Sequence, residues 1–357
     1  MKKSKKAAIE VSFNWIFVLI AGGVILLFFI NLVGTQKEKS QMNIALTVKT
    51  ELKSIFTGAT LSQARQLDID IPKTTLNFIC DFTTCTDFEE SDTPSCYSEY
   101  SIGETGVNEK TPAQIIFAPS ELFGKKILTW TLSWNVPFYV TNFLYITGTD
   151  VKYIFVGSSD SANNFYNKFP EKTNKYLRTP NLAPQEEADG NHNFKFIFFD
   201  SDPTTFTVSD EIISIANPSN INAVKIDTSS KQISFYYFTD DHTFELEDYI
   251  HYLTEAEAYA AIFSDSYNFY KCNLQKAFNR LHLISTLLKV RSETLYNDPQ
   301  TPSRCKGTYD INNNGLTTIV ENSITFFDSN ILQISNSAQT LSISNRDTQE
   351  KSCALIY

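Results

Sequence analysis

The hydrophobic pattern of this chain changes its period along the sequence, and each period predicts a different kind of structure. Residues 13–33 form an apolar run of 21 positions without a formal charge, enough for a helix to cross about 30 Å of hydrocarbon. Apolar side chains then recur at steps of three and four through residues 44–55. This spacing predicts that the helix continues as a stalk and ends before Gly58.

Residues 72–157 change to segments rich in β-branched and aromatic side chains, several of them separated by Pro, Gly, Asn, Asp or Ser. This pattern predicts strands. A short helix over 159–169 and an apolar strand over 194–200 are typical of a strand–helix–strand crossover with parallel strands. The polar segment 170–191 predicts an exposed loop, and residues 221–239 predict a β-hairpin.

The last third of the chain has helical periodicity. Thr254 and Glu257 have the spacing of a capping box, and one apolar face continues from there to about Leu295. A second face steps alternately by four and three, as a heptad seam does. Two antiparallel helices packed against each other and the sheet explain it, and the alternative is a seam for association with another copy or another surface protein. The seam residues are Val320, Ile324, Phe327, Ile331, Ile334, Ala338 and Leu341.

These elements predict a mixed α/β (α+β) fold with a transmembrane and stalk helix, a mixed sheet containing a βαβ unit, and a C-terminal antiparallel helical pair. The expected divisions are a cytoplasmic basic segment (1–12), a transmembrane helix (13–33), a stalk helix (34–57), a sheet-rich α/β ectodomain (58–250) and a helical region packed on it (251–357).

The basic residues beside the apolar run predict its orientation. Four lysines precede the run, whereas Lys37 and Lys39 follow it with Glu38 between them. The positive-inside bias therefore favours a cytoplasmic N-terminus and an extracytoplasmic bulk. A cleaved signal peptide is the alternative, but the run is longer than such a peptide needs and no A-x-A pattern follows it.

The residues before the run, Lys5-Lys6-Ala7-Ala8-Ile9-Glu10, resemble an archaeal class III (type IV prepilin-like) signal. The resemblance implies cleavage after Ala7 on the cytoplasmic side, with Ala7, Ala8, Ile9 and Glu10 as the processing region. It also implies a long first helix whose C-terminal half, the half outside the membrane, packs on the head. More loosely, this block and the C-terminal segment 352–357 resemble uncharacterised, single-pass membrane-anchored proteins of small-genome archaea.

The net charge of the chain limits the kinds of partner that it can bind. The 357-residue chain has a net charge of −10 although its first residues are basic, so the remainder is strongly acidic. An acidic body repels phosphate backbones, which argues against nucleic acid as a partner. The expected partner is the lipid bilayer.

The cysteines predict disulfides. Six cysteines in an outward-facing domain permit 15 connectivities, and the positions are Cys80, Cys85, Cys96, Cys272, Cys305 and Cys353. A helical hairpin turning near residue 312 would place Cys272 beside Cys353, and a pair among the first three would staple the first strands. Zinc is the alternative, but the first three cysteines have no histidine nearby as a fourth ligand.

One segment matches the spacing of a calcium loop. Asp310, Asn312, Asn314 and Glu321 stand at loop positions one, three, five and twelve, with Gly315 at position six. The residues before Asp310 do not predict an incoming helix, and the alternative is a polar turn with helix capping. No other cofactor is expected.

Recognisable catalytic motifs are absent from the sequence: it contains no G-x-S-x-G, H-E-x-x-H, P-loop or G-x-G-x-x-G. The favoured function is therefore structural or interaction-based at the cell surface, as a prepilin-like subunit or a plain anchored protein. One alternative is an envelope enzyme with a metal-assisted hydrolase or transferase site at Asp200, Asp202 and Asp240. Another is a calcium-stabilised adhesion module.

Overall fold

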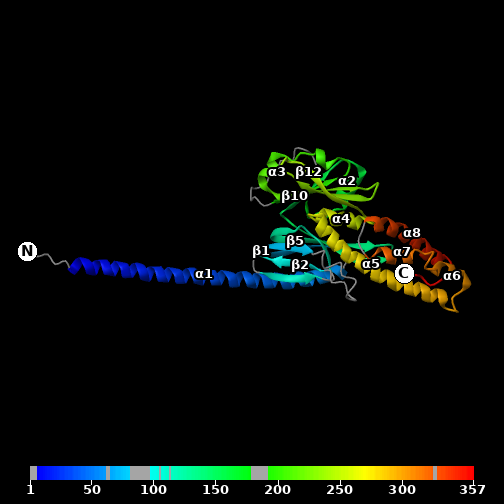
Figure 1. Cartoon of the computed structure of the whole chain (residues 1–357), viewed down its shortest axis with the longest axis horizontal. Helices are drawn as coiled ribbons and strands as arrows, with labels where there is room; N and C mark the ends of the chain where they lie inside the picture. Colours follow the sequence, from blue (N-terminus) through cyan, green and yellow to red (C-terminus); the bar gives the residue numbers. More distant parts are fainter. Residues whose placement is uncertain are drawn as a thin grey trace, which may run out of the picture.

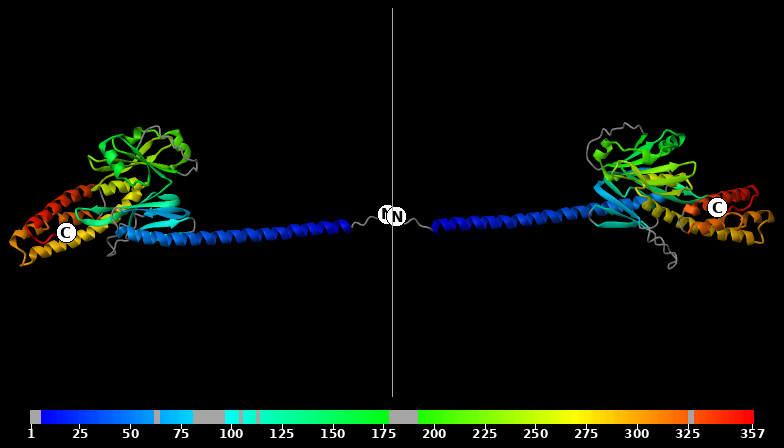
Figure 2. Two further views of the ribbon diagram at one scale, coloured as in Figure 1. Left: turned by 180° about the vertical axis from the view of Figure 1, so that it is seen from behind. Right: turned by 45° about the horizontal axis from the view of Figure 1, so that its top comes forward.

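The fold is mixed α/β, as the sequence predicts. The computed structural model describes residues 6–61, 65–80, 97–103, 106–111, 114–177, 192–324 and 328–357. These residues form eight α-helices and two mixed six-stranded sheets (Figure 1). A long N-terminal helix leaves the head on one side, and the C-terminal helices extend on the other (Figure 2).

Helix α1 (Lys6–Leu61) is continuous, so the apolar run and the stalk belong to one rod of 56 residues. It continues through Gly58, where the sequence predicts its end. At 1.5 Å per residue the rod is about 84 Å long, and only its last third lies against the head (Figure 1).

The first sheet carries the end of α1. Its strand order is β3-β2-β1-β5-β6-β4, and every pairing is antiparallel except β4 with β6. The ladder between β1 and β5 shifts register between Asp70 and Thr74, on either side of Pro72, which has no N–H to donate. The strands are β1 (Gln66–Cys80), β2 (Ser98–Ile102), β3 (Val107–Thr111), β4 (Ile115–Phe117), β5 (Glu121–Asn135) and β6 (Tyr139–Gly148).

The second sheet has the order β12-β11-β10-β9-β7-β8. Strand β7 pairs in parallel with both β8 and β9, and helix α2 (Asp160–Lys168) connects β7 to β8. The parallel pairing of β7 with β9 confirms the expected parallel strands, and the antiparallel pair β10–β11 confirms the hairpin. Helix α2 leads first into β8, a strand inside the segment 170–191 where the sequence predicts an exposed loop. The strands are β7 (Val151–Val156), β8 (Asn174–Leu177), β9 (His192–Phe198), β10 (Ala216–Asp227), β11 (Gln232–Phe238) and β12 (Phe244–His251).

The two faces of the second sheet are covered differently. Helix α4 (Glu255–Phe263) packs on one face, which belongs to the same hydrophobic core as the first sheet. The other face forms a smaller core with the short helices η2 (Pro203–Thr205) and α3 (Asp210–Ile215). Strands that are buried on both faces have nearly continuous apolar sequences. Because the second sheet is covered on both faces, the apolar run in β9 is explained.

Helix α4 (Glu255–Phe263) lies between the two sheets, and every side chain from Ala256 to Phe263 is buried. Its start is fixed as the capping pattern predicts, because the Glu257 carboxylate accepts the backbone N–H of Thr254 at 3.0 Å. The same carboxylate accepts the Trp134 indole N–H at 3.0 Å, and the Tyr145 hydroxyl donates to the Ala256 carbonyl. Both donors come from the first sheet, so α4 is tied to it at its first turn.

The C-terminal helices reverse direction twice. Helix α5 runs away from the sheets, α7 runs back toward them, and α8 runs away from them again. Helix α7 is antiparallel to α5, since Ser292 bonds to Asn314 near the tip and Gln275 bonds to Ile324 near the sheets. The heptad pattern predicts a single helix, but the structure has two, α7 and α8. Residues 325–327, which connect them, lie outside the described ranges. The helices are α5 (Tyr267–Asn297), α6 (Ser303–Tyr309), α7 (Leu316–Asn322) and α8 (Asp328–Glu350).

This path corrects the expected disulfide pairing. Helix α8 starts beside His251 of the second sheet and runs toward the tip in the same direction as α5. Its far end therefore lies at α6, where Cys353 bonds to Cys305, and Cys272 bonds to Cys80 instead. Cys85 and Cys96 lie outside the described residues.

Phe263 tests the role of α4 because its ring meets aromatic side chains from both sheets at centroid distances of 5.1 to 6.2 Å, including 5.1 Å to Tyr145 and 5.5 Å to Tyr153. We expect Phe263→Ala to lower the free energy of unfolding by about 3–5 kcal/mol. Leu246→Ala, at a side chain that is 50% exposed, should change it by less than about 0.5 kcal/mol. Denaturant titration measures both, and equal effects would contradict the central position of α4.

Candidate functional site

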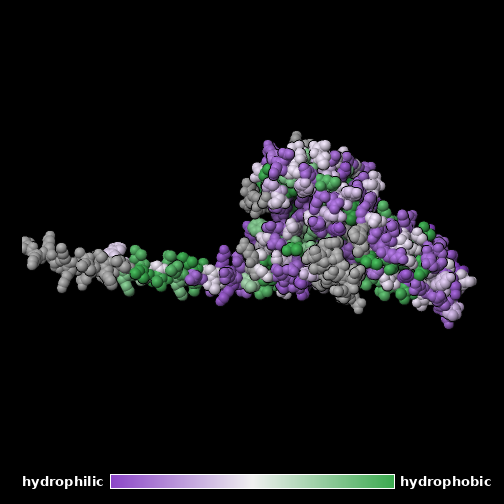
Figure 3. Space-filling view, in the orientation of Figure 1, coloured by the Kyte–Doolittle hydropathy of each residue, from purple (hydrophilic) through white to green (hydrophobic). Residues whose placement is uncertain are grey.

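Helix α1 has an outer half with no protein packed around it. Large apolar side chains are exposed on all sides between Trp15 and Val33, with Leu26 62% and Phe29 55% exposed. They form the continuous hydrophobic band on the rod in Figure 3. This is the one described helix that is long and apolar enough to cross a membrane. The N-terminal helix is therefore compatible with a single-pass membrane anchor.

The inner half of α1 is seated on the first sheet. Ala45, Val48, Leu52 and Phe56 follow one another at steps of three and four and are all at most 2% exposed. The Phe56 ring meets the Tyr100 ring of β2 edge-on at 5.4 Å. On this one face the inner half of α1 has the protein contacts that the outer half lacks.

Two lysines of α1 form salt bridges with the edge strand β3 of the first sheet, beside the buried stripe. We call these two salt bridges the clamp. Lys49 and Lys53 place their Nζ atoms 2.8 and 2.6 Å from the Glu109 carboxylate of β3. Hydrogen bonds from these lysines lower the pKa of Glu109. Lys49 also donates to the Asn108 carbonyl at 3.0 Å, so the clamp fixes the rotation of α1 against the edge of the sheet.

The expected processing residues lie in the first turns of the rod. Residues 7–10 belong to α1, which begins at Lys6. Only their backbone is described, and cleavage after Ala7 stays a prediction.

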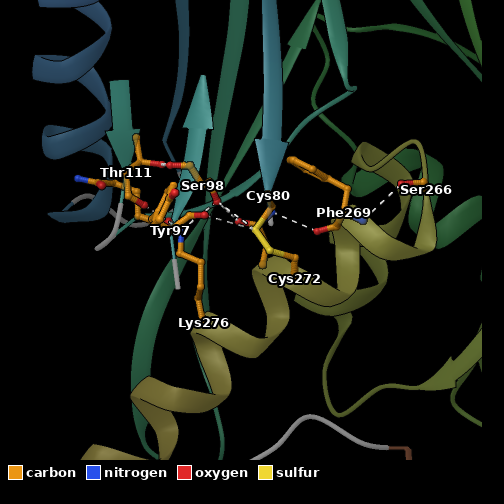
Figure 4. Close-up of a disulfide and its surroundings, with 10 residues drawn as sticks. Cys80, Tyr97, Ser98, Thr111, Ser266, Phe269, Cys272 and Lys276 are labelled. Atoms are coloured by element: carbon orange, nitrogen blue, oxygen red, sulfur yellow. Dashed lines mark hydrogen bonds between the residues drawn. A yellow bond between two sulfur atoms is a disulfide. The ribbon is translucent and has the colours of Figure 1, made fainter. Parts of the chain in front are cut away.

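A second cluster joins the first sheet to the C-terminal helices (Figure 4). Cys80, at the end of β1, is bonded to Cys272 in the second turn of α5, with 5.9 Å between the Cα atoms. One turn further, Lys276 donates from Nζ to Ser98 Oγ at 3.0 Å, to the Thr111 carbonyl at 2.9 Å and to the Gln114 carbonyl. We call this group the sheet–helix junction.

The junction has the composition of a serine–lysine pair but the geometry of a structural one. Ser98 donates its hydroxyl proton to Asn273 Oδ1 at 2.7 Å, while the Lys276 ammonium donates toward Ser98. Burial lowers the pKa of Lys276 to about 7. Ser98 is 3% and Lys276 5% exposed, so a substrate has no access to this hydroxyl. The arrangement therefore holds elements together rather than attacking a substrate.

Sequence reasoning missed the junction, although a signal for it exists. Asn273 and Lys276 are polar residues within the apolar stripe of Phe269, Cys272 and Leu274. A lysine among residues of a buried helix face requires oxygen acceptors. The sequence could not supply their identity, because Ser98 and Thr111 are more than 160 residues away.

Two more buried ionisable groups lie between the sheets. Lys195 of β9 donates to the Ser264 carbonyl, and burial lowers its pKa to about 8. Asp150, just before β7, accepts the Phe123 N–H at 3.1 Å, and burial raises its pKa to about 6. Burial is the main cause of both pKa shifts, and each group makes a hydrogen bond to the backbone.

Three of the predicted calcium-loop residues, Asp310, Asn312 and Asn314, lie in a turn between α6 and α7. The incoming helix that the sequence does not predict is present as α6, which ends at Tyr309. Asp310 accepts from the Asn312 N–H and from the Asn313 amide, and Asn314 is buried against Ser292. Gly315 has a φ of 87°, and a Cβ there would lie 2.5 Å from the Ser337 carbonyl oxygen. The turn therefore requires glycine for reasons of packing as well.

Glu321 is exposed five residues into α7, and calcium binding stays a prediction. Among the described residues, no three His, Cys, Asp or Glu side chains gather as a metal site.

The acidic residues of the enzyme alternative have local roles. Asp200 follows β9 and accepts the Ser159 N–H at 3.2 Å, near the start of α2. Asp202 caps η2 through the Thr204 N–H at 3.0 Å. Asp240 lies in the turn after β11. Nothing in this geometry supports metal-assisted catalysis.

No family model, curated protein or solved structure matches the chain.

The buried ammonium of Lys276 predicts a pH dependence. Its folded-state pKa of about 7 lies below the ordinary 10.5, so the unfolded chain binds more protons between these values and wild-type stability rises with pH. Lys276→Met removes this dependence. We expect the free energy of unfolding to shift in favour of the wild type between pH 7 and 10, by up to about 1.4 kcal/mol per pH unit.

Denaturant titration at several pH values measures this difference. Lys125→Met, at an exposed lysine, controls for the loss of one positive charge. A difference between Lys276→Met and wild type that stays constant from pH 7 to 10 would contradict the lowered pKa of Lys276 in the folded protein.

Proposed function

We propose that this protein is a single-pass membrane protein with a cytoplasmic N-terminus, and that its head is a structural or interaction module at the cell surface. The observation that carries the proposal is the division of α1. One continuous helix exposes large apolar side chains over residues 15–33 and buries an apolar stripe over residues 45–56. An exposed apolar surface of this extent needs a partner, and a bilayer matches its length.

The orientation rests on two further observations. Four lysines precede the apolar run within the first six residues, which favours the cytoplasmic side for this end. Among the described residues, two disulfides cross-link the part of the chain that follows α1, and such bonds persist in oxidising compartments outside the cytoplasm.

The prepilin-like identity is the finer part of the proposal. Its support is the resemblance of residues 5–10 to an archaeal class III signal, together with the long first helix whose inner half packs on a mostly antiparallel sheet. In this case Ala7, Ala8, Ile9 and Glu10 are the processing region, and the apolar half of α1 provides the anchor or the core of a filament.

Several residues of the expected heptad seam pack in the core of the protein. Ile331, Ile334 and Leu341 are at most 2% exposed and belong to the main hydrophobic core. Self-association is therefore better assigned to α1 than to this seam.

Membrane anchoring by α1 can be tested by fractionation. We expect the full chain to stay in the membrane pellet after alkaline carbonate washing. Val24→Arg with Leu27→Arg should release it, because each arginine at the centre of a span costs about 2.5–3.5 kcal/mol. Leu46→Arg, at an exposed position of the stalk, should stay in the pellet. Release of the wild type would contradict the anchor.

Processing can be tested independently by mass spectrometry of the native N-terminus. We expect a mature chain that begins at Ala8, and Ala7→Asp should leave the precursor uncut because the site requires a small residue. A wild-type chain that begins at Met1 or Lys2 would remove the prepilin-like identity and leave the plain anchor.

A further inference from the structure

The Cys80–Cys272 disulfide closes a very large loop. The two cysteines are 192 positions apart, and the loop contains every strand from β2 to β12 together with α2, α3 and α4. The whole second sheet is thus an excursion between the end of β1 and the start of α5.

The bond also creates a short covalent route through the molecule. The chain passes from α1 into β1, crosses the disulfide and continues along α5 to the distal tip. Figures 1 and 2 show α1 and the tip of the C-terminal helices at opposite ends of the molecule. The route therefore joins the end that carries the apolar anchor to the end farthest from it.

The parts of this route resist extension. Strand β1 is nearly fully extended as a β-strand, so tension along it gains little length. It lies between β2 and β5, hydrogen-bonded on both sides. At its end, the bonds from Lys276 and Asn273 to β2 and its neighbours hold α5 against the sheet beside the disulfide.

We propose that the Cys80–Cys272 disulfide is a mechanical bypass. It carries tension between the membrane anchor and a load at the distal helices, and it shields the second sheet from that tension. The proposal rests on the proposed function, because only a protein anchored at α1 and engaged at its far end experiences such a load. Without the bond, the same tension passes through β2 to β12 in turn and can peel the strands apart.

Optical tweezers can measure this with the full-length protein in detergent micelles, held by tags at both termini. The wild type should extend without releasing the loop. Cys80→Ala with Cys272→Ala should begin to unfold at lower force, and its fully unfolded length should be greater by about 65 nm, the length of 192 extended residues.

The matched control is Cys305→Ala with Cys353→Ala. It opens a loop of 48 positions on the same route between the termini, but that loop contains only the distal helices and should lengthen the unfolded chain by only about 16 nm. An unchanged first unfolding force in the Cys80/Cys272 variant would overturn the bypass.

A second measurement avoids dependence on the folding of the variant. Folded wild type is held at constant force below its unfolding force, and a thiol reductant is added. Steps that together exceed the roughly 16 nm of the Cys305–Cys353 loop should follow reduction, because the Cys80–Cys272 loop adds about 65 nm. A chain that lengthens by no more than the smaller loop after both bonds are cleaved would overturn the proposal. Membrane fractionation reports on the anchor separately, so failure of the anchor and failure of the bypass are distinguishable.

Discussion

The structure depends on the requirement that one helix be stable in two environments. Every backbone N–H in the middle of α1 is bonded within the helix, so its apolar half can leave water without unpaired donors. Its inner half gains stability from Leu52 and Phe56, which are buried against the sheet. Because both halves belong to one continuous helix, the clamp at Glu109 fixes how the head is oriented relative to the apolar half of α1.

The head is organised by two further connections. Helix α4 lies buried between the sheets, and its first turn bonds to Trp134 and Tyr145 of the first sheet. The sheet–helix junction ties the same sheet to α5 through Cys80–Cys272 and Lys276. The first sheet therefore contacts α1, α4 and α5, and it is the part through which anchor, second sheet and distal helices are joined.

Sequence patterns predicted those features that depend on neighbouring residues. The apolar run, the crossover from β7, the hairpin β10–β11 and the cap of α4 all follow from local periodicity or spacing. The pairing of Cys272 with Cys353 was predicted wrongly, because it assumed one long helix where α7 and α8 turn back on each other. The junction at Lys276 was missed, because its acceptors come from strands far away in the chain.

By itself the sequence determined where apolar faces lie and that four lysines precede a run able to span a bilayer, because hydrophobic period and charge are written in consecutive residues. Only the tertiary structure decided which cysteines meet, which face α1 presents to the sheet, and how the buried Lys276 is satisfied. These outcomes depend on the directions in which distant elements run, and those directions are set by packing of the whole core.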